Sequence, residues 1–397
     1  MDINKLRELL PRVGTPSYIF DLDAFEKRAL QVKKAFGDSI GLCFSIKANP
    51  FLLGRLPDCF DKIEVCSPGE LTVCERTGAD MSTVIFSGVN KGYEDVERAA
   101  DDRVGTFTAE SPLHLDLIND AALRRDEVFD LLLRVTDIKG GSQFGMSEET
   151  TLDLIRRRDE FKGVRIVGLH YFTGTAKRKA KAIEKECDYL IELTGRIRNE
   201  LGFDIERIEY GTGLAVDYFS ENADAEEEER LASIAPKLRE LAQVAGLTVE
   251  MGRFFAAPCG YYLTRVADTK TNFDINYAIV DGGMNQVKYN GQLQGMQIPE
   301  ILHLKAQDGA GDGTEKPWTL CGSICTTADI LARNAVFTDL CIGDILVFCR
   351  TGAYSCMEGI TTFLSREMPV IAEYSEKEGL RILREKLYSD VFNTPNR

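Results

Sequence analysis

The residue with the clearest chemical potential in this chain is Lys47, which follows an apolar run at residues 41–46. The run predicts a buried β-strand, so the lysine is expected where that strand opens into a loop. A buried amine is costly unless it is paired or reactive. An amine whose pKa is lowered by its surroundings can form a Schiff base with an aldehyde, although most lysines at strand ends simply extend into solvent. The other strand ends must decide between these interpretations.

The elements that would position this lysine are a repeated pattern of strands and helices. Strand-like runs alternate with segments of helical periodicity, at residues 42–46, 62–65, 83–86, 104–107, 130–135, 164–169, 205–210 and 247–250. Eight such repeats close a (β/α)8 barrel, and this number favours the barrel over an open, doubly wound sheet. We therefore predict an α/β fold with a TIM barrel over residues 23–255.

The pattern changes after the eighth run, where strands and glycine-rich turns replace most helices. A second, mostly β domain is therefore expected over residues 256–397. A further strand-like run lies at residues 17–20, and we expect the segment 1–22 to join this β domain.

Glycines follow the seventh and eighth predicted strands of the barrel: Gly211 and Gly213 after the seventh, and Gly252 after the eighth. In barrel enzymes these loops commonly bind phosphate, because bare peptide N–H groups can approach it closely. Any one of these glycines alone would be an ordinary turn residue. Together with Lys47 they predict pyridoxal 5′-phosphate (PLP), an aldehyde with a phosphate tail.

Two further strand ends carry side chains that PLP would use. Glu250 ends the eighth predicted strand, where a carboxylate could keep the pyridine nitrogen protonated and make the ring a strong electron sink. His170 follows the sixth strand and could stack on the ring, although a lone histidine is more often a core residue satisfied by its neighbours.

Eight short motifs resemble those of the fold-type III PLP-dependent decarboxylases, the family of diaminopimelate, ornithine and biosynthetic arginine decarboxylases. The motifs lie at residues 45–49, 67–71, 168–170, 210–213, 250–253, 280–285, 321–329 and 352–354. Each is short, but eight in register over nearly the whole chain are specific. The resemblance implies a PLP-binding barrel of the alanine racemase type and an amino-acid decarboxylase, with diaminopimelate decarboxylase as the nearest named relative.

The resemblance also implies roles for the motif residues. Lys47 would hold PLP through a Schiff base, His170 would stack on the ring, and Glu250 would pair with the pyridine nitrogen. The phosphate would be bound by the loops that contain Gly211, Gly213 and Gly252. A hydroxyl group of Thr175 or Tyr354 would lie nearby.

The resemblance assigns proton return to Cys325, with Lys47 as the alternative donor, once CO2 has left the substrate. In this family the cysteine segment is contributed across a head-to-tail dimer. An obligate homodimer with shared active sites is therefore implied.

Departures from the family pattern bear on the substrate. Diamine-producing members commonly carry an acid after the catalytic cysteine, whereas this chain has Thr326, with Asp329 nearby to serve instead. Diaminopimelate enzymes place an arginine where this chain has Tyr289, although Arg253 is kept as a possible carboxylate ligand. We expect a diamino acid, a substituted or D-configured amino acid, or a carboxylated amine.

Three other functions remain open. An amino-acid racemase of similar fold would pair arginine, not Glu250, with the pyridine nitrogen. A catalytically silent homologue that regulates an active enzyme would not need Lys47, Glu250 and Cys325 together. A phosphate-binding barrel enzyme unrelated to PLP would explain the glycines but not these three residues.

The composition of the chain argues against several classes of binding partner. The net charge of −15 argues against nucleic acid and anionic membranes. No window approaches the roughly 20 apolar residues of a membrane span, and the first residues lack a signal-peptide core, so a cytoplasmic location is expected. The 11 cysteines are expected to be free thiols, and three histidines make a histidine-rich metal site improbable, so no metal is predicted.

Overall fold

The computed structural model describes residues 1–137, 142–306 and 313–395, which divide into two compact units. One unit comprises Arg28–Val216 and Asp224–Phe255, and we call it the barrel unit. The other comprises Met1–Lys27, Asp217–Ala223 and Ala256–Arg397, and we call it the β unit. Helix α2 (Leu22–Phe36) crosses from one to the other.

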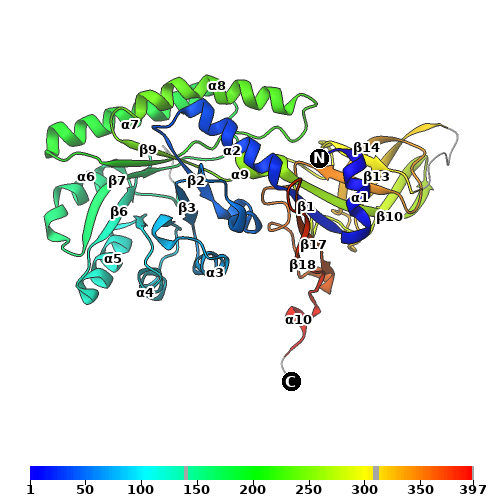
Figure 1. Cartoon of the computed structure of the whole chain (residues 1–397), viewed down its shortest axis with the longest axis horizontal. Coiled ribbons are helices and arrows are strands. Elements are labelled where there is room, and N and C mark those ends of the chain that lie inside the picture. Colours follow the sequence, from blue (N-terminus) through cyan, green and yellow to red (C-terminus); the bar gives the residue numbers. More distant parts are fainter. Residues whose placement is uncertain (138–141, 307–312, 396–397) are drawn as a thin grey trace. The chain divides into compact units, whose positions relative to one another are not determined.

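The barrel unit is built on a closed barrel of eight parallel strands (Figure 1). The strands are β2 (Gly41–Ser45), β3 (Lys62–Val65), β4 (Val84–Phe86), β5 (Thr106–Ala109), β6 (Phe129–Arg134), β7 (Val164–Tyr171), β8 (Arg207–Gly211) and β9 (Gly246–Met251). Pairing of β2 with β9 closes the barrel. The predicted fold class is confirmed, with strand boundaries shifted by at most two residues.

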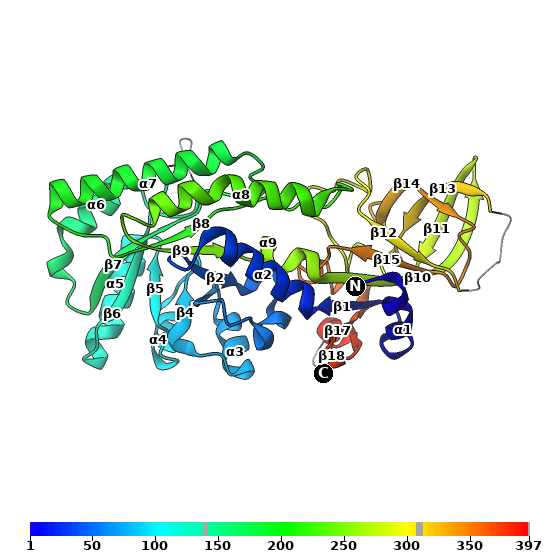
Figure 2. The same cartoon turned by 45° about the horizontal axis from the view of Figure 1, so that its top comes forward.

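Helices surround these strands, as Figures 1 and 2 show from two directions. They are α3 (Pro68–Thr77), α4 (Tyr93–Asp101), α5 (Pro112–Arg125), α6 (Glu148–Arg156), α7 (Ala180–Leu201) and α8 (Ala223–Leu241). Two of them start on a serine followed by proline. Ser67 accepts a hydrogen bond from the N–H of Glu70, and Ser111 accepts one from the N–H of His114. Serine caps the helix and proline suits its first position, so these strands stop and the helices begin.

The barrel interior is apolar below its carboxyl end. Cys43, Ile85, Leu132 and Val167 form a buried cluster there, and each comes from a different strand. Burial of side chains from several strands fixes the register of the barrel. The strands therefore present their carboxyl ends at defined heights.

The β unit contains a nine-stranded sheet whose main order is β14-β13-β11-β10-β1-β17-β18. Its strands are β1 (Ser17–Asp21), β10 (Gly260–Asn272), β11 (Ile275–Val280), β12 (Ile301–Leu304), β13 (Glu315–Cys321), β14 (Ile330–Thr338), β15 (Ile345–Cys349), β17 (Val370–Ser375) and β18 (Gly379–Arg384). The amino-terminal strand β1 pairs antiparallel with β10 and parallel with β17.

Smaller elements complete the β unit. Helix α1 (Ile3–Val13) buries Leu6 and Leu9 in a core cluster with Ile19 of β1. The short strands β16 (Glu367–Met368) and β19 (Leu387–Tyr388) pair with each other, and α10 (Asp390–Asn393) follows them.

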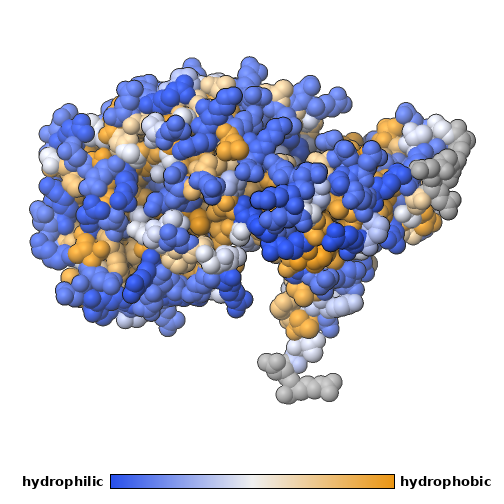
Figure 3. All heavy atoms as spheres, viewed as in Figure 1, coloured by the Kyte–Doolittle hydropathy of each residue, from blue (hydrophilic) through white to orange (hydrophobic). Residues whose placement is uncertain are grey.

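The face of the molecule in Figure 3 is mostly hydrophilic, with scattered apolar side chains. Within the described residues, no helix is both long and apolar enough to cross a membrane.

Candidate active site

Lys47 lies in a short 3-10 turn (Ile46–Ala48) directly after β2. Its Nζ is 2.6 Å from Oε2 of Glu64 and 3.5 Å from Oε1 of Glu250. The two carboxylates are buried, with 3% and 7% of each side chain exposed, whereas the lysine side chain remains 36% exposed. The amine is therefore held by charges from β3 and β9 while part of it stays accessible.

The Glu250 carboxylate contacts three side chains, those of Lys47, Ser45 and His170. Its Oε1 accepts a hydrogen bond from Ser45 Oγ at 3.0 Å, and its Oε2 lies 3.0 Å from Nε2 of His170. Burial alone would raise the pKa of Glu250, but the charge of Lys47 and the hydrogen bond from His170 outweigh it and hold that pKa well below its ordinary value. The carboxylate therefore stays ionised at neutral pH.

His170 is the second-last residue of β7, and 3% of its side chain is exposed. Because Glu250 is ionised, Nε2 of the imidazole donates to it. Its buried Nδ1 has no hydrogen-bond partner among the described residues. The hydrogen bond at Nε2 therefore orients the imidazole ring and holds it beside the Glu250 carboxylate.

Two residues of this cluster were not among the sequence candidates. Glu64 interrupts the apolar strand β3, and Cys66 follows that strand with its Sγ donating to Oε1 of Glu64 at 2.8 Å. The Cys66 sulfur also lies 3.5 Å from Nζ of Lys47. Burial and the charge of Glu64 raise the pKa of the Cys66 thiol. The sequence signal that could have identified Glu64 is an acidic residue at a position of β3 that faces the barrel interior.

The predicted glycines occupy positions where a side chain would not fit. A Cβ on Gly213 would lie 1.9 Å from the carbonyl oxygen of Gly174, and the backbone of Gly213 has a φ of +61°. A Cβ on Gly211 would lie 2.6 Å from the Phe172 ring, and one on Gly252 would lie 2.6 Å from Cβ of Ala48. Close approach of bare backbone is the property that a phosphate loop needs.

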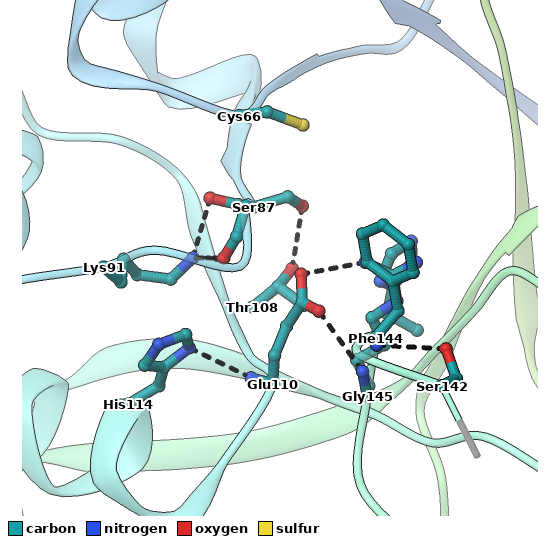
Figure 4. A network of polar contacts seen from close by, with 12 residues as sticks. Cys66, Ser87, Lys91, Thr108, Glu110, His114, Ser142, Phe144 and Gly145 are labelled. Carbon is teal, nitrogen blue, oxygen red and sulfur yellow. Dashed lines mark hydrogen bonds and ion pairs between the residues drawn. The ribbon is translucent and has the colours of Figure 1, made fainter.

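A second polar network orders the neighbouring strand ends (Figure 4). Buried Lys91 donates to the carbonyls of Ser87 and Gly88 at 2.7 and 2.8 Å, and burial lowers its pKa to about 8. Nη1 of Arg134 donates to Oε1 of Glu110 at 2.8 Å. These contacts fix the residues that directly follow β4 and β5, and the last residue of β6, at the carboxyl end of the barrel.

The remaining predicted residues differ in exposure. Thr175 is exposed in the loop after β7, and Arg253 begins the short helix α9 (Arg253–Ala256). In the β unit, Cys325 and Thr326 are exposed in the loop between β13 and β14, and Tyr354 is half-buried at a φ of +64°. The structure therefore brings Lys47, His170 and Glu250 together, with Glu250 in contact with both of the other side chains.

Two predicted substrate ligands have buried side chains with backbone partners. The Asp329 carboxylate accepts N–H groups of Met284 at 2.8 Å and Ile324 at 2.9 Å, and the residue is 3% exposed. Tyr289 is also 3% exposed, and its hydroxyl donates to the carbonyl of Cys349 at 2.6 Å. These contacts stabilise the loops that carry the two residues, and their role as substrate ligands stays a prediction.

The protein is thus an eight-stranded barrel whose carboxyl end carries the amine of Lys47, paired with the carboxylates of Glu64 and Glu250. Glycine-containing loops follow strands at the same end of the barrel. The family model described as "Pyridoxal-dependent decarboxylase, pyridoxal binding domain" matches residues 22–257, more than half of the chain. The chain belongs to this family of PLP-dependent decarboxylases, which confirms the predicted family, enzyme class and cofactor.

Curated relatives extend the match over nearly the full length. The chain is 25% identical to L-glutamyl-[BtrI acyl-carrier protein] decarboxylase of Niallia circulans, over 93% of this chain and 91% of that protein. It is 26% identical to diaminopimelate decarboxylase of Haemophilus influenzae, over 88% and 86%. The crystal structure of Methanocaldococcus jannaschii diaminopimelate decarboxylase with L-lysine shares the fold, with a TM-score of 0.83, 21% identity, and coverage of 96% and 92%.

We predict that Gly213→Ala destabilises the protein more than Gly202→Ala. Both glycines have positive φ, +61° and +58°, but only Gly213 has backbone within 4 Å of the added Cβ. We expect about 1 kcal/mol for Gly202→Ala from backbone strain alone. For Gly213→Ala we expect about 3 kcal/mol or more. Urea unfolding of the two variants measures the difference, and equal costs would show that the loops relax around the new methyl group.

Proposed function

We propose that the protein removes the α-carboxylate of an amino acid bound at the barrel mouth, with PLP attached to Lys47. The observation that carries this proposal is the placement of that amine between the buried carboxylates of Glu64 and Glu250. When bound, PLP supplies an electron sink for the electron pair of the broken carbon–carboxylate bond. The protein supplies the charges and contacts around it.

The residues at the barrel mouth fit this cofactor. Lys47 offers the amine for its aldehyde, and ionised Glu250 suits a protonated pyridine nitrogen. This carboxylate favours decarboxylation over racemisation, because an arginine in its place would leave the nitrogen unprotonated. His170, held by Glu250, would cover one face of the ring. Gly211 and Gly213 would receive the phosphate.

The substrate's far end is proposed to carry no free ammonium group. In the segment 321–329, which contains Cys325, the single acid is Asp329, and its carboxylate is buried on backbone N–H groups. Exposed Thr326 offers a hydroxyl that accepts the N–H of Ala328 at 3.3 Å, and no charge. A distal ammonium would therefore lack an ionic partner from this segment.

An amino acid whose far end is acylated or linked to a carrier meets this condition. One relative is named for an L-glutamyl group held on an acyl-carrier protein, and it matches 93% of this chain. We propose an L-glutamyl amide or thioester as the substrate class, with free diamino acids as the alternative that the following experiments separate. Release of CO2 from a panel containing γ-L-glutamyl thioesters, L-lysine, L-ornithine and meso-diaminopimelate tests this directly.

We further propose that the enzyme works as a homodimer, in which Cys325 of the partner subunit returns the proton to the substrate carbon. The exposure of Cys325 in its loop supports this, because a donor for another subunit's site must be accessible. Each protomer would then hold one complete barrel and lend one cysteine.

We predict that borohydride reduction of the PLP-loaded protein attaches the cofactor irreversibly to Lys47. Peptide mass spectrometry should find the adduct on this residue and not on Lys91, a buried lysine at the same end of the barrel whose pKa is lowered to about 8. The Lys47→Ala variant should carry no adduct and no decarboxylase activity. An adduct on Lys91 in the wild-type protein would contradict the assignment.

We predict that Thr326→Glu shifts selectivity toward substrates with a distal ammonium. A new charged hydrogen bond should raise kcat/KM for L-lysine or L-ornithine, relative to a γ-L-glutamyl thioester, by about tenfold or more. Thr326→Ser is the matched control, because it keeps the hydroxyl and adds no charge. If Thr326→Glu and Thr326→Ser showed the same selectivity, this position would not face the substrate.

We predict that two inactive variants restore activity when mixed. Lys47→Ala lacks the cofactor amine, and Cys325→Ala lacks the proton donor, so each alone should be nearly inactive. Random subunit exchange makes half of the dimers mixed, and each mixed dimer has one intact site, so activity should recover to about one quarter of the wild-type level. Recovery should not occur if Cys325 served the barrel of its own chain.

A further inference from the structure

Glu186 connects the loop after β7 to strand β8, whose carboxyl end carries the proposed phosphate glycines Gly211 and Gly213. It lies on α7 between Ile183 and Leu190, both of which are buried. Spacings of three and four residues place Glu186 on this same inward face of the helix. A carboxylate on an apolar helix face is costly unless it is fully hydrogen-bonded, and its side chain is only 12% exposed.

The Glu186 carboxylate receives donors from two segments of the chain. Its Oε2 accepts from Nζ of Lys177 at 2.7 Å and from the hydroxyl of Tyr210 at 2.5 Å. Its Oε1 accepts from the hydroxyl of Thr173. Thr173 and Lys177 belong to the loop after β7, and Tyr210 belongs to β8. One acid thus holds three side chains on two adjoining strand ends.

The residues that Glu186 contacts are adjacent to Gly211 or bonded to Gly213, the proposed phosphate glycines. Tyr210 immediately precedes Gly211. The N–H of Lys177 donates to the carbonyl of Gly213 at 2.9 Å. Gly174, next to Thr173, packs so closely on Gly213 that no Cβ fits between them. The positions of the Glu186 partners therefore set the positions of both glycine backbones.

We propose that Glu186 is a positioning residue for the cofactor phosphate. It fixes the loop after β7 against the loop after β8, so that the bare N–H groups of Gly211 and Gly213 are held ready for the anion. The carboxylate itself does not touch the phosphate, which its charge would repel. This inference rests on the proposed function, because it requires PLP at these loops.

The experiment compares binding of PLP with binding of pyridoxal, which lacks the phosphate. Titrations of the apoprotein, followed by absorbance, give dissociation constants for the wild type, Glu186→Gln and Glu192→Gln. Glu192 is exposed on the same helix, so its variant is the matched control. We expect Glu186→Gln to weaken PLP binding by about tenfold, the loss of one charged hydrogen bond, with pyridoxal and Glu192→Gln unchanged.

A second, milder variant tests the same hydrogen-bond network in case Glu186→Gln does not fold. Tyr210→Phe removes one donor and keeps the ring, and it should weaken PLP binding in the same direction but less. Equal loss of PLP and pyridoxal affinity in Glu186→Gln would overturn the inference, since the damage would not be specific to the phosphate. So would an unchanged PLP dissociation constant. A wild-type protein that bound PLP no better than pyridoxal would instead overturn the phosphate loop and the proposed function with it.

Discussion

Excess negative charge buried at one end of the barrel is the constraint on which the site depends. Glu64, Glu209 and Glu250 point into the same region, and Lys47 is the cation that pairs with two of them. Burial and the charge of Glu250 raise the pKa of Glu209 well above its ordinary value, whereas Lys47 and His170 hold that of Glu250 low. The charge of Lys47 thus favours the ionised form of Glu250, whereas burial disfavours the ionised form of Glu209.

Strand register creates this arrangement. Cys43 pairs with Glu250 across β2 and β9, and Ser45 pairs with Glu64 across β2 and β3. Both acids therefore reach Lys47, the second residue after β2. A slip of one residue in either pairing would turn the acid away from the barrel interior. The cluster is therefore a consequence of barrel closure, and the apolar layer below it supplies the energy that keeps the register.

Sequence reasoning reached the lysine, His170 and Glu250 because parallel strands of a barrel all end on one side. It could not identify Glu64 or Glu186, whose importance lies in partners distant along the chain, although each breaks an apolar pattern. It also predicted substrate contacts for Asp329 and Tyr289, but it could not show that both side chains are buried and bonded to backbone groups. A motif gives a position along the chain, whereas burial and side-chain direction come from packing.

If the proposed function holds, the chemistry of carboxylate removal and the choice of substrate are under separate physical control. The barrel residues that would bind PLP form one interlocked network, so a change in any of them disturbs the charge balance of all. Thr326 is exposed and its hydroxyl accepts a single weak backbone contact, so its identity can change at little cost to stability. A decarboxylase with this division can acquire a new substrate class by altering one loop position while the electrostatics around Lys47 remain intact.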